Sequence, residues 1–231
     1  MRYSPTVLSI LLTAVQALSS VQFPTVAVLP IQGVADVTAG NGFNSIATSL
    51  LSSAQGVSIQ ADSISLANAK LGASGSAAAG AGANLPSIDV ARAIQNATNT
   101  FWQTTADVEM KVCSVVLSIN QQNIATQQAN LVAGINAQAQ VILKLAASIQ
   151  ATISKVQDQV TAFTDSEKAI VAAAIASALA SAQASVVPIA NLSDGLKAAG
   201  LVGFADAVSS LQGSVAALAS TAAKVNFGVS H

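Results

Sequence analysis

The sequence contains few charged residues, and this shortage limits the functions open to it. Of 231 residues, 8% are Asp, Glu, Lys or Arg, whereas soluble chains average about 25%. The formal net charge is −1, so the chain lacks the positive surface that nucleic acids and anionic lipids require. Low charge with 52% apolar residues is typical of membrane proteins, fibres and proteins that meet an apolar or carbohydrate-rich partner.

Histidine and cysteine are almost absent, which removes most familiar catalytic and metal sites. His231 is the only histidine and Cys113 the only cysteine, so Ser-His-Asp and Cys-His groups, common zinc sites and an internal disulfide are not expected. Cys113 either fills a small apolar space, which we favour, or pairs with a second chain. Asp107 and Glu109 would point about 200° apart around a helix, so they do not form a paired-carboxylate site. We expect no enzymatic activity, no cofactor and no metal.

The chain begins with the pattern of a secretory signal peptide. Arg2 gives a positive start, VLSILLTAVQAL is an apolar stretch of suitable length, and Val15 and Ala17 have the small side chains found before a cleavage site. Residues 1–17 are therefore the expected signal, and the protein is expected to be secreted. Cleavage after Ser19 is an alternative, as is an uncleaved anchor or a core helix.

Apolar residues recur every seven residues through most of the remaining chain, with a second set four residues on. This spacing places them on one stripe of an α-helix. The longest stripe lies in the segment INAQAQVILKLAASIQATISKVQDQVTAF and joins Ile135, Ile142, Ile149, Val156 and Phe163. Because such stripes must be buried, we expect an all-α fold, an antiparallel bundle of about four to five long amphipathic helices with slight left-handed supercoiling.

Glycine, proline and serine divide the chain into segments. Residues 18–43 are an expected extended lead-in, and 44–71 an N-terminal helix. The Gly/Ala/Ser-rich stretch 72–86 is an expected flexible linker, and the main helical bundle is expected at 87–227.

Local signals predict where the first two helices of this main bundle begin and end. Ser87 is the expected cap of the first one, with Asp89 in its first turn. The polar stretch 120–130 loses the apolar pattern, so we expect a break or bend near residues 120–123. The next helix is then expected to start near Gly134.

Further signals mark the helix ends in the C-terminal part. Thr164 and Glu167 have the T-x-x-E spacing of a capping box. Pro188 is expected to end the helix that follows. A short helix is then expected from Ser193 or Asp194 to Gly200, before a last helix with an apolar stripe that starts at Phe204 and ends at Val225.

Several residues are candidates for surface or ligand roles. Asn96 and Asn191 each begin an N-glycosylation sequon, the first beside the buried stripe and the second in the loop expected after Pro188. Trp102 is either a core side chain or an amphipathic ring at a surface or ligand mouth. Six apolar stripe residues are candidates to face a ligand: Phe101, Val108, Ile142, Ile149, Phe163 and Phe204.

The uncharged segment 169–193 raises the question of a membrane span. It is long enough to cross a bilayer. Its strongly apolar residues are few and lie on one side of a helix, however, while Ser and Gln lie near its middle. We therefore expect a helix of the bundle and no transmembrane span.

An amphipathic bundle of this kind has two routes to a ligand. It can open or leave an apolar cavity for an acyl chain, or its helices can spread on an apolar surface. The Gln, Asn, Ser and Thr of the outer faces can also hydrogen-bond a cell-wall glycan, which is a further candidate partner. The alternative function is structural, a coiled-coil-like extracellular protein that self-assembles without a ligand.

The Ala/Ser/Thr/Val-rich helical run across 88–225 resembles a known family. The run is clearest in VQDQVTAFTDSEKAIVAAAIASALASAQASVVPIANLSDGLKAAG. In composition and helix rhythm it is similar to the fungal hydrophobic-surface-binding and cell-wall galactomannoprotein family. This resemblance implies a secreted helical bundle at the cell wall that binds lipids or hydrophobic surfaces.

Overall fold

Five α-helices make up the described part of this computed structural model, and the all-α prediction is confirmed. The structure describes residues 42–73, 86–116, 124–198 and 203–227. Among these residues there is no strand, and a 3-10 turn at Val160–Ala162 joins two of the helices. The helices are α2 (Gly42–Ala73), α3 (Pro86–Val116), α4 (Ile124–Asp158), α5 (Asp165–Ala198) and α6 (Ala205–Ala222). The expected signal 1–17, the lead-in as far as residue 41 and the linker residues 74–85 lie outside the described residues.

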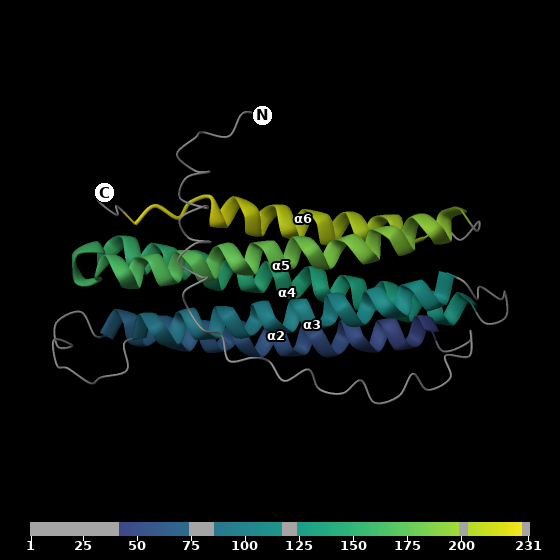
Figure 1. Ribbon diagram of the computed structural model, residues 1–231, viewed down its shortest axis with the longest axis horizontal. Coiled ribbons are helices and arrows are strands. Elements are labelled where there is room, and N and C mark those ends of the chain that lie inside the picture. The colour runs from purple at the N-terminus through teal and green to yellow at the C-terminus, as the bar shows by residue number, and fades with distance from the viewer. Residues whose placement is uncertain (1–41, 74–85, 117–123, 199–202, 228–231) are drawn as a thin grey trace.

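The helices run up and down in alternation and close into a ring. In Figure 1, α2, α4 and α6 run in one direction, and α3 and α5 run in the opposite direction. Around the ring, α2 packs on α3, α3 on α5, α5 on α6, α6 on α4, and α4 on α2. The α2–α4, α3–α5 and α4–α6 neighbours are therefore parallel, and helix α2 is an integral part of the bundle.

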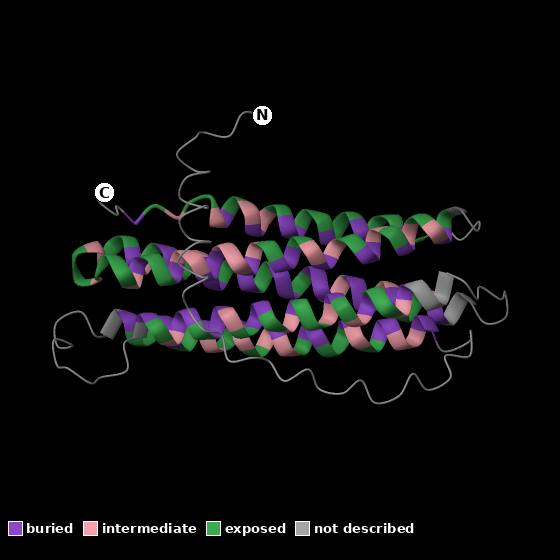
Figure 2. Cartoon of the chain, viewed as in Figure 1, coloured by how far each residue is buried: buried purple, intermediate pink, exposed green. Residues whose placement is uncertain are grey.

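The apolar stripes read from the sequence form the core of this ring. Ile135, Ile142, Ile149 and Val156 of α4 are buried, and so are the corresponding stripes of the other helices. Figure 2 shows buried residues along the inward sides of the helices and exposed residues along the outward sides. Burying each large aliphatic side chain stabilises the fold by about 1.5–3 kcal/mol, so these stripes hold the helices together.

Small residues bring α2 and α4 close together. A Cβ atom built on Gly134 of α4 would lie 3.2 Å from both the Ala47 carbonyl oxygen and the Leu50 Cβ of α2. One turn further along α4, the Gln138 side-chain amide donates to the Leu50 carbonyl oxygen at 2.8 Å. The close approach and the buried hydrogen bond together set the register of this parallel pair.

A second group of polar side chains joins the same two helices. Asn68 of α2 donates to the Ser148 carbonyl oxygen at 3.1 Å and accepts a hydrogen bond from the Thr152 hydroxyl at 3.0 Å. Asn68, Ser148 and Thr152 are all buried. Sliding α2 along α4 would leave these groups unpaired at a cost of about 1–3 kcal/mol each, so the alignment is well defined.

The predicted starts of α3 and α4 were wrong. The first helical residue of α3 is Pro86, a residue type suited to this position because its missing N–H has no partner there in any case. Ser87 lies inside the first turn instead of capping it. Helix α4 begins at Ile124 instead of near Gly134, because the polar stretch places Gln127 in a buried position next to the core. The expected break at 120–123 lies outside the described residues, as does the side chain of Cys113.

Helix α5 continues through Pro188, so the predicted helix end and the separate short helix were also wrong. Ile189, Leu192 and Leu196 extend the buried stripe beyond the proline. Their burial outweighs the roughly 3 kcal/mol that an internal proline costs a helix. Phe163, predicted to end the stripe of α4, follows the 3-10 turn in an extended conformation and is partly buried against the core.

The predicted capping box joins the turn to α5 and also ties α5 to α3. The Thr164 amide and hydroxyl donate to Glu167 Oε2 at 2.9 and 2.8 Å, and the Glu167 amide donates to Thr164 Oγ1 at 3.3 Å. The other Glu167 oxygen accepts a hydrogen bond from the Ser87 hydroxyl at 2.7 Å. One carboxylate therefore aligns the first turns of two parallel helices.

Two glycines in helices should respond oppositely to a larger side chain. Gly134→Val would press against the backbone of Ala47, and we expect the free energy of unfolding to fall by about 2–3 kcal/mol.

Gly213 of α6 has open space where a Cβ would lie. Gly213→Ala should therefore raise the free energy of unfolding by about 0.5–1 kcal/mol, because alanine has the higher helix propensity. Urea unfolding followed by circular dichroism measures both values. A stable Gly134→Val variant would contradict the close α2–α4 contact.

Glu167 makes stability depend on pH. Burial acts to raise the pKa of the Glu167 carboxyl, but hydrogen bonds from the Ser87 hydroxyl and from the Thr164 amide and hydroxyl lower it, and the net pKa lies below its ordinary value of 4.5. Because the pKa is lower in the folded chain, the stabilisation is fully present above the unfolded value and is lost as pH falls through the folded pKa. The Tm advantage over Glu167→Gln should therefore be constant near pH 7 and shrink below about pH 4.5. A difference that persists undiminished at pH 2 would count against this role.

Candidate functional site

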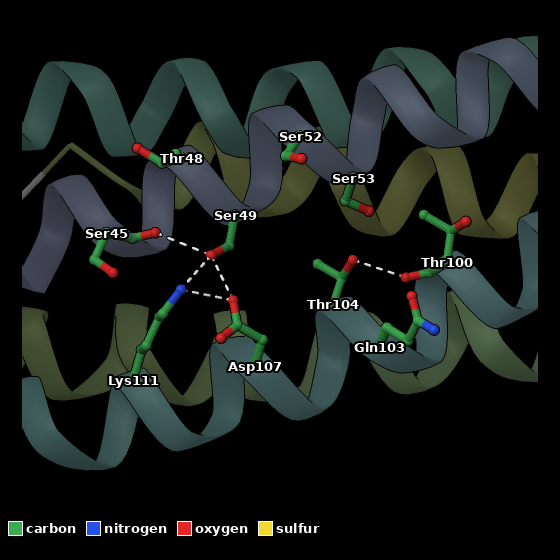
Figure 3. Close-up of a pocket in the computed structure, with 10 residues that line it drawn as sticks. All are labelled: Ser45, Thr48, Ser49, Ser52, Ser53, Thr100, Gln103, Thr104, Asp107 and Lys111. Atoms are coloured by element: carbon green, nitrogen blue, oxygen red, sulfur yellow. Dashed lines mark hydrogen bonds and ion pairs between the residues drawn. The ribbon is translucent and has the colours of Figure 1, made fainter. Parts of the chain in front are cut away.

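A polar groove lies between α2 and α3, and we call it the α2–α3 groove (Figure 3). It has a volume of about 550 Å³ and is open to solvent on one side. Helix α2 contributes Ser45, Thr48, Ser49, Ser52 and Ser53. Helix α3 contributes Thr100, Gln103, Thr104, Asp107 and Lys111. Seven of these ten residues carry a hydroxyl group, and the remainder are one amide, one carboxylate and one ammonium.

Helical spacing explains why these side chains face each other. On α3, Thr100, Thr104, Asp107 and Lys111 are four, three and four residues apart, which places them on one stripe. On α2 the serines and Thr48 follow similar steps. Side chains this short leave space between antiparallel helices that Leu or Ile would fill, so the sequence produces a groove here instead of a packed apolar contact.

Three side chains at one end of the groove form a closed triangle. Lys111 Nζ lies 2.6 Å from Asp107 Oδ2 and donates to Ser49 Oγ at 2.5 Å. The Ser49 hydroxyl donates to Asp107 Oδ2 at 2.5 Å, with the Ser45 carbonyl oxygen as a second acceptor at 3.0 Å. Both charged side chains are partly exposed, so the ion pair contributes no more than about 1 kcal/mol. Its main effect is to position Ser49 and to join α2 to α3.

The triangle supplies hydrogen-bonding groups with no net charge. Lys111 is an ammonium held against a carboxylate, so it can only donate hydrogen bonds. It has no lone pair with which to take the Ser49 proton, so it does not activate Ser49 as a nucleophile. Asp107 is an acceptor, and it offsets the charge of Lys111. The groove wall at this end therefore presents one fixed donor, one fixed acceptor and a hydroxyl whose proton is already donated within the protein.

Ser53 has a different environment from the other hydroxyls of the groove. Its residue is 4% exposed, and its Oγ has no hydrogen-bond partner among the residues that the structure describes. Figure 3 shows it on the side of α2 that turns towards Thr100 and Thr104. A buried hydroxyl without a partner costs about 1–3 kcal/mol, so a molecule in the groove that bonded to Ser53 would recover that energy.

The apolar residues predicted to face a ligand belong to the core and not to the groove. They are buried or partly buried against one another, and none lines the α2–α3 groove: Phe101, Val108, Ile142, Ile149, Phe163 and Phe204.

The two sequon asparagines and the single tryptophan lie on the surface. Asn96 is exposed on α3, and Asn191 is exposed on α5. The loop predicted around Asn191 is absent because the helix continues through Pro188; use of either sequon stays a prediction. Trp102 is 50% exposed. Of the two alternatives, a core side chain and an amphipathic ring at the surface, the structure therefore supports the second.

The outer face of α5 is the second surface of interest. Helices α4 and α5 are each long and apolar enough to cross a membrane by length and composition alone, but 56% of the apolar window of α4 is buried in the bundle against 39% of that of α5. Segment 169–193 of α5 has no charged residue. Ile170 and Val187 on this helix are 44% and 57% exposed, so an uncharged and partly apolar surface faces outward.

Comparisons with known proteins found no match to this chain among protein-family models, curated proteins or solved structures. The family resemblance described above therefore stays a prediction. Within the described ranges, no cluster of three or more His, Cys, Asp or Glu side chains is placed to hold a metal ion.

Sequence reasoning missed the α2–α3 groove, although a signal was present. The stripe of Thr100, Thr104, Asp107 and Lys111 includes an Asp–Lys pair at the spacing of a helical ion pair. Such a stripe is equally compatible with a solvent-facing surface. Only the packing of α2 on α3, with Ser49 opposite Asp107, distinguishes a groove from an ordinary polar face.

Proposed function

We propose that the protein is a secreted, non-enzymatic helical protein that binds lipids or apolar surfaces through the outer face of α5. The observation that carries the proposal is the exposure of Ile170 and Val187 on a segment, 169–193, that has no charged residue. Binding an apolar surface removes the water from whatever side chains face it. A charged side chain there would cost several kcal/mol, whereas an uncharged polar group left without a partner costs about 1–3 kcal/mol and alanine has no polar side-chain group to desolvate.

The position of Trp102 supports the same surface. Helices α3 and α5 are parallel neighbours, and Ser87 of α3 is bonded to Glu167 of α5. Trp102 is fifteen residues after Ser87 on α3, and position 182 is fifteen residues after Glu167 on α5. Because both helices rise by the same distance per residue, Trp102 lies at about the height of position 182 along the bundle axis. Position 182 is between Ile170 and Val187. A half-exposed indole suits the boundary between water and an apolar phase.

The structural alternative, self-assembly through the seven-residue stripes, has less support. Those stripes are buried between helices of a single chain, so they are not free to form a coiled coil with another molecule unless the bundle opens. Secretion and a location outside the cell or at the cell wall belong to the same proposal. They rest on the signal pattern at residues 1–17 and on the family resemblance.

Replacing the exposed aliphatics of α5 by lysine should weaken binding to neutral phosphatidylcholine vesicles. For the double variant Ile170→Lys/Val187→Lys we expect the partition coefficient to fall about tenfold or more, because each lysine removes apolar contact and must keep its charge in water. Vesicle sedimentation of the mature protein measures the coefficient. The matched control is Ile59→Lys/Leu66→Lys on α2, which replaces residues 63% and 65% exposed and adds the same charge. An equal loss in both variants would contradict the assignment to α5.

Trp102 gives an independent measurement because it is the only tryptophan. Its half-exposed ring should emit at long wavelength in water. If the α3–α5 side meets the lipid, its emission maximum should shift to shorter wavelength on addition of phosphatidylcholine vesicles, and a brominated lipid should quench it. Vesicle binding with no change in Trp102 emission would place the contact on another face of the bundle.

A further inference from the structure

We propose that the α2–α3 groove is a binding site for a neutral polyhydroxylated ligand, a short oligosaccharide in chemical class. The proposal concerns a different surface from the outer face of α5 and does not depend on lipid binding. Three properties of the groove lead to it: its balance of charge, its hydroxyl groups and the unpaired hydroxyl of Ser53.

The charge balance excludes ions as the favoured ligands. Lys111 is the only cationic residue that lines the groove, and Asp107 lies 2.6 Å from it. A phosphate or sulfate would have to compete with the Asp107 carboxylate for the ammonium. A cation would have to compete with the ammonium for the carboxylate. A neutral ligand carries no charge that competes with either partner, so the ion pair stays intact when such a ligand binds.

The hydroxyl groups match a ligand that is itself made of hydroxyls. Seven Ser and Thr side chains line the walls. The hydroxyls of Thr48, Thr100 and Thr104 already donate to the carbonyl oxygen four residues earlier in their own helix, so these three present acceptor lone pairs to a ligand. Gln103 adds an amide that can both donate and accept. Sugars present hydroxyl groups together with apolar C–H faces. The groove offers both kinds of surface, because the short Ser and Thr side chains carry hydroxyls while much of the exposed lining is apolar. The volume of about 550 Å³ is within the range of small-molecule sites, about 300–1,000 Å³.

Among the residues that line the groove, Ser53 gives the strongest single reason to expect a ligand. The residue lines the groove, is 4% exposed, and its Oγ has no partner in the described part of the chain. An alanine would fit the same position without an unsatisfied group. The Ser53 Oγ is itself covered, so a ligand hydroxyl reaches it once the side chain rotates towards the groove. The Ser53 hydroxyl then has no protein hydrogen bond to give up, unlike Thr100 and Thr104.

The test uses the full mature chain, labelled with ¹⁵N, in NMR titrations without lipid. The probes are laminarihexaose and maltohexaose as neutral oligosaccharides and a heparin hexasaccharide as an anionic one. We expect millimolar binding of at least one neutral probe, with shifts confined to α2 and α3 around Ser53, Thr104 and Asp107. The heparin fragment should bind at least about tenfold more weakly, because it would have to displace Asp107 from Lys111.

Three variants separate binding from folding. Ser53→Ala should weaken the neutral probe about three- to tenfold while Tm stays constant or rises, since no protein hydrogen bond is lost. Thr104→Val, of nearly the same shape, should also weaken it. Ser214→Ala, a buried serine of α6 whose hydroxyl donates to the Leu211 carbonyl oxygen, is the control and should leave the affinity unchanged.

Specific outcomes would overturn the proposal. Absence of shifts with both neutral probes at 20 mM would show that the groove holds water only. Binding that Ser53→Ala and Thr104→Val leave unchanged would place the sugar elsewhere. Equal or tighter binding of the heparin fragment would exclude a neutral ligand class. Because no lipid is present, none of these results bears on the outer face of α5.

Discussion

The parallel contact between α2 and α4 determines how the other helices are arranged. Gly134 against Ala47 and Leu50, and Asn68 between Ser148 and Thr152, hold these two helices side by side. Helix α3, which connects α2 to α4 in the sequence, packs on the side of α2 and also contacts α5. Helix α6 closes the ring between α5 and α4. Because α3 packs on α2 through short polar side chains, the same arrangement that closes the core also leaves the α2–α3 groove open.

The sequence was sufficient to predict the helices and the buried stripes, because both depend on local spacing. Ile142 and Phe101 are buried where their seven-residue pattern placed them, and the capping box at Thr164 forms as expected. Predictions failed where a distant contact outweighed a local preference. The chain passes Pro188 as a helix because Leu192 and Leu196 have a core to enter, and no local rule contains that information.

The α2–α3 groove and the α5 face were harder to predict for the same reason. Ser49 and Asp107 are 58 positions apart in sequence, and nothing in either local pattern indicates that they meet. The strongly apolar residues of segment 169–193 were expected on one side of the helix, and this was wrong for Ile170 and Val187, which are exposed. Their exposure depends on how much of α5 the neighbouring helices cover. Helix type follows from a single segment, whereas a site made by two segments requires the packing of the whole ring.

The few charges of the chain are distributed in a way that is consistent with one uncharged surface on α5 and one groove in which the charges balance. Lys144 of α4 bonds to Asp62 and Ser58 of α2, and Lys111 pairs with Asp107 at the groove, so these cations are used to join helices or are balanced. On α5, all charged residues lie in the first four positions or from Asp194 onwards. A helix that only needed solubility would gain from charges along its whole outer face. The charges of α5 are confined to its two ends, so the middle of its outer face has no charge that an apolar surface would have to desolvate. The α2–α3 groove lies on the other flank of α3, so the two proposed ligands would not compete for the same surface.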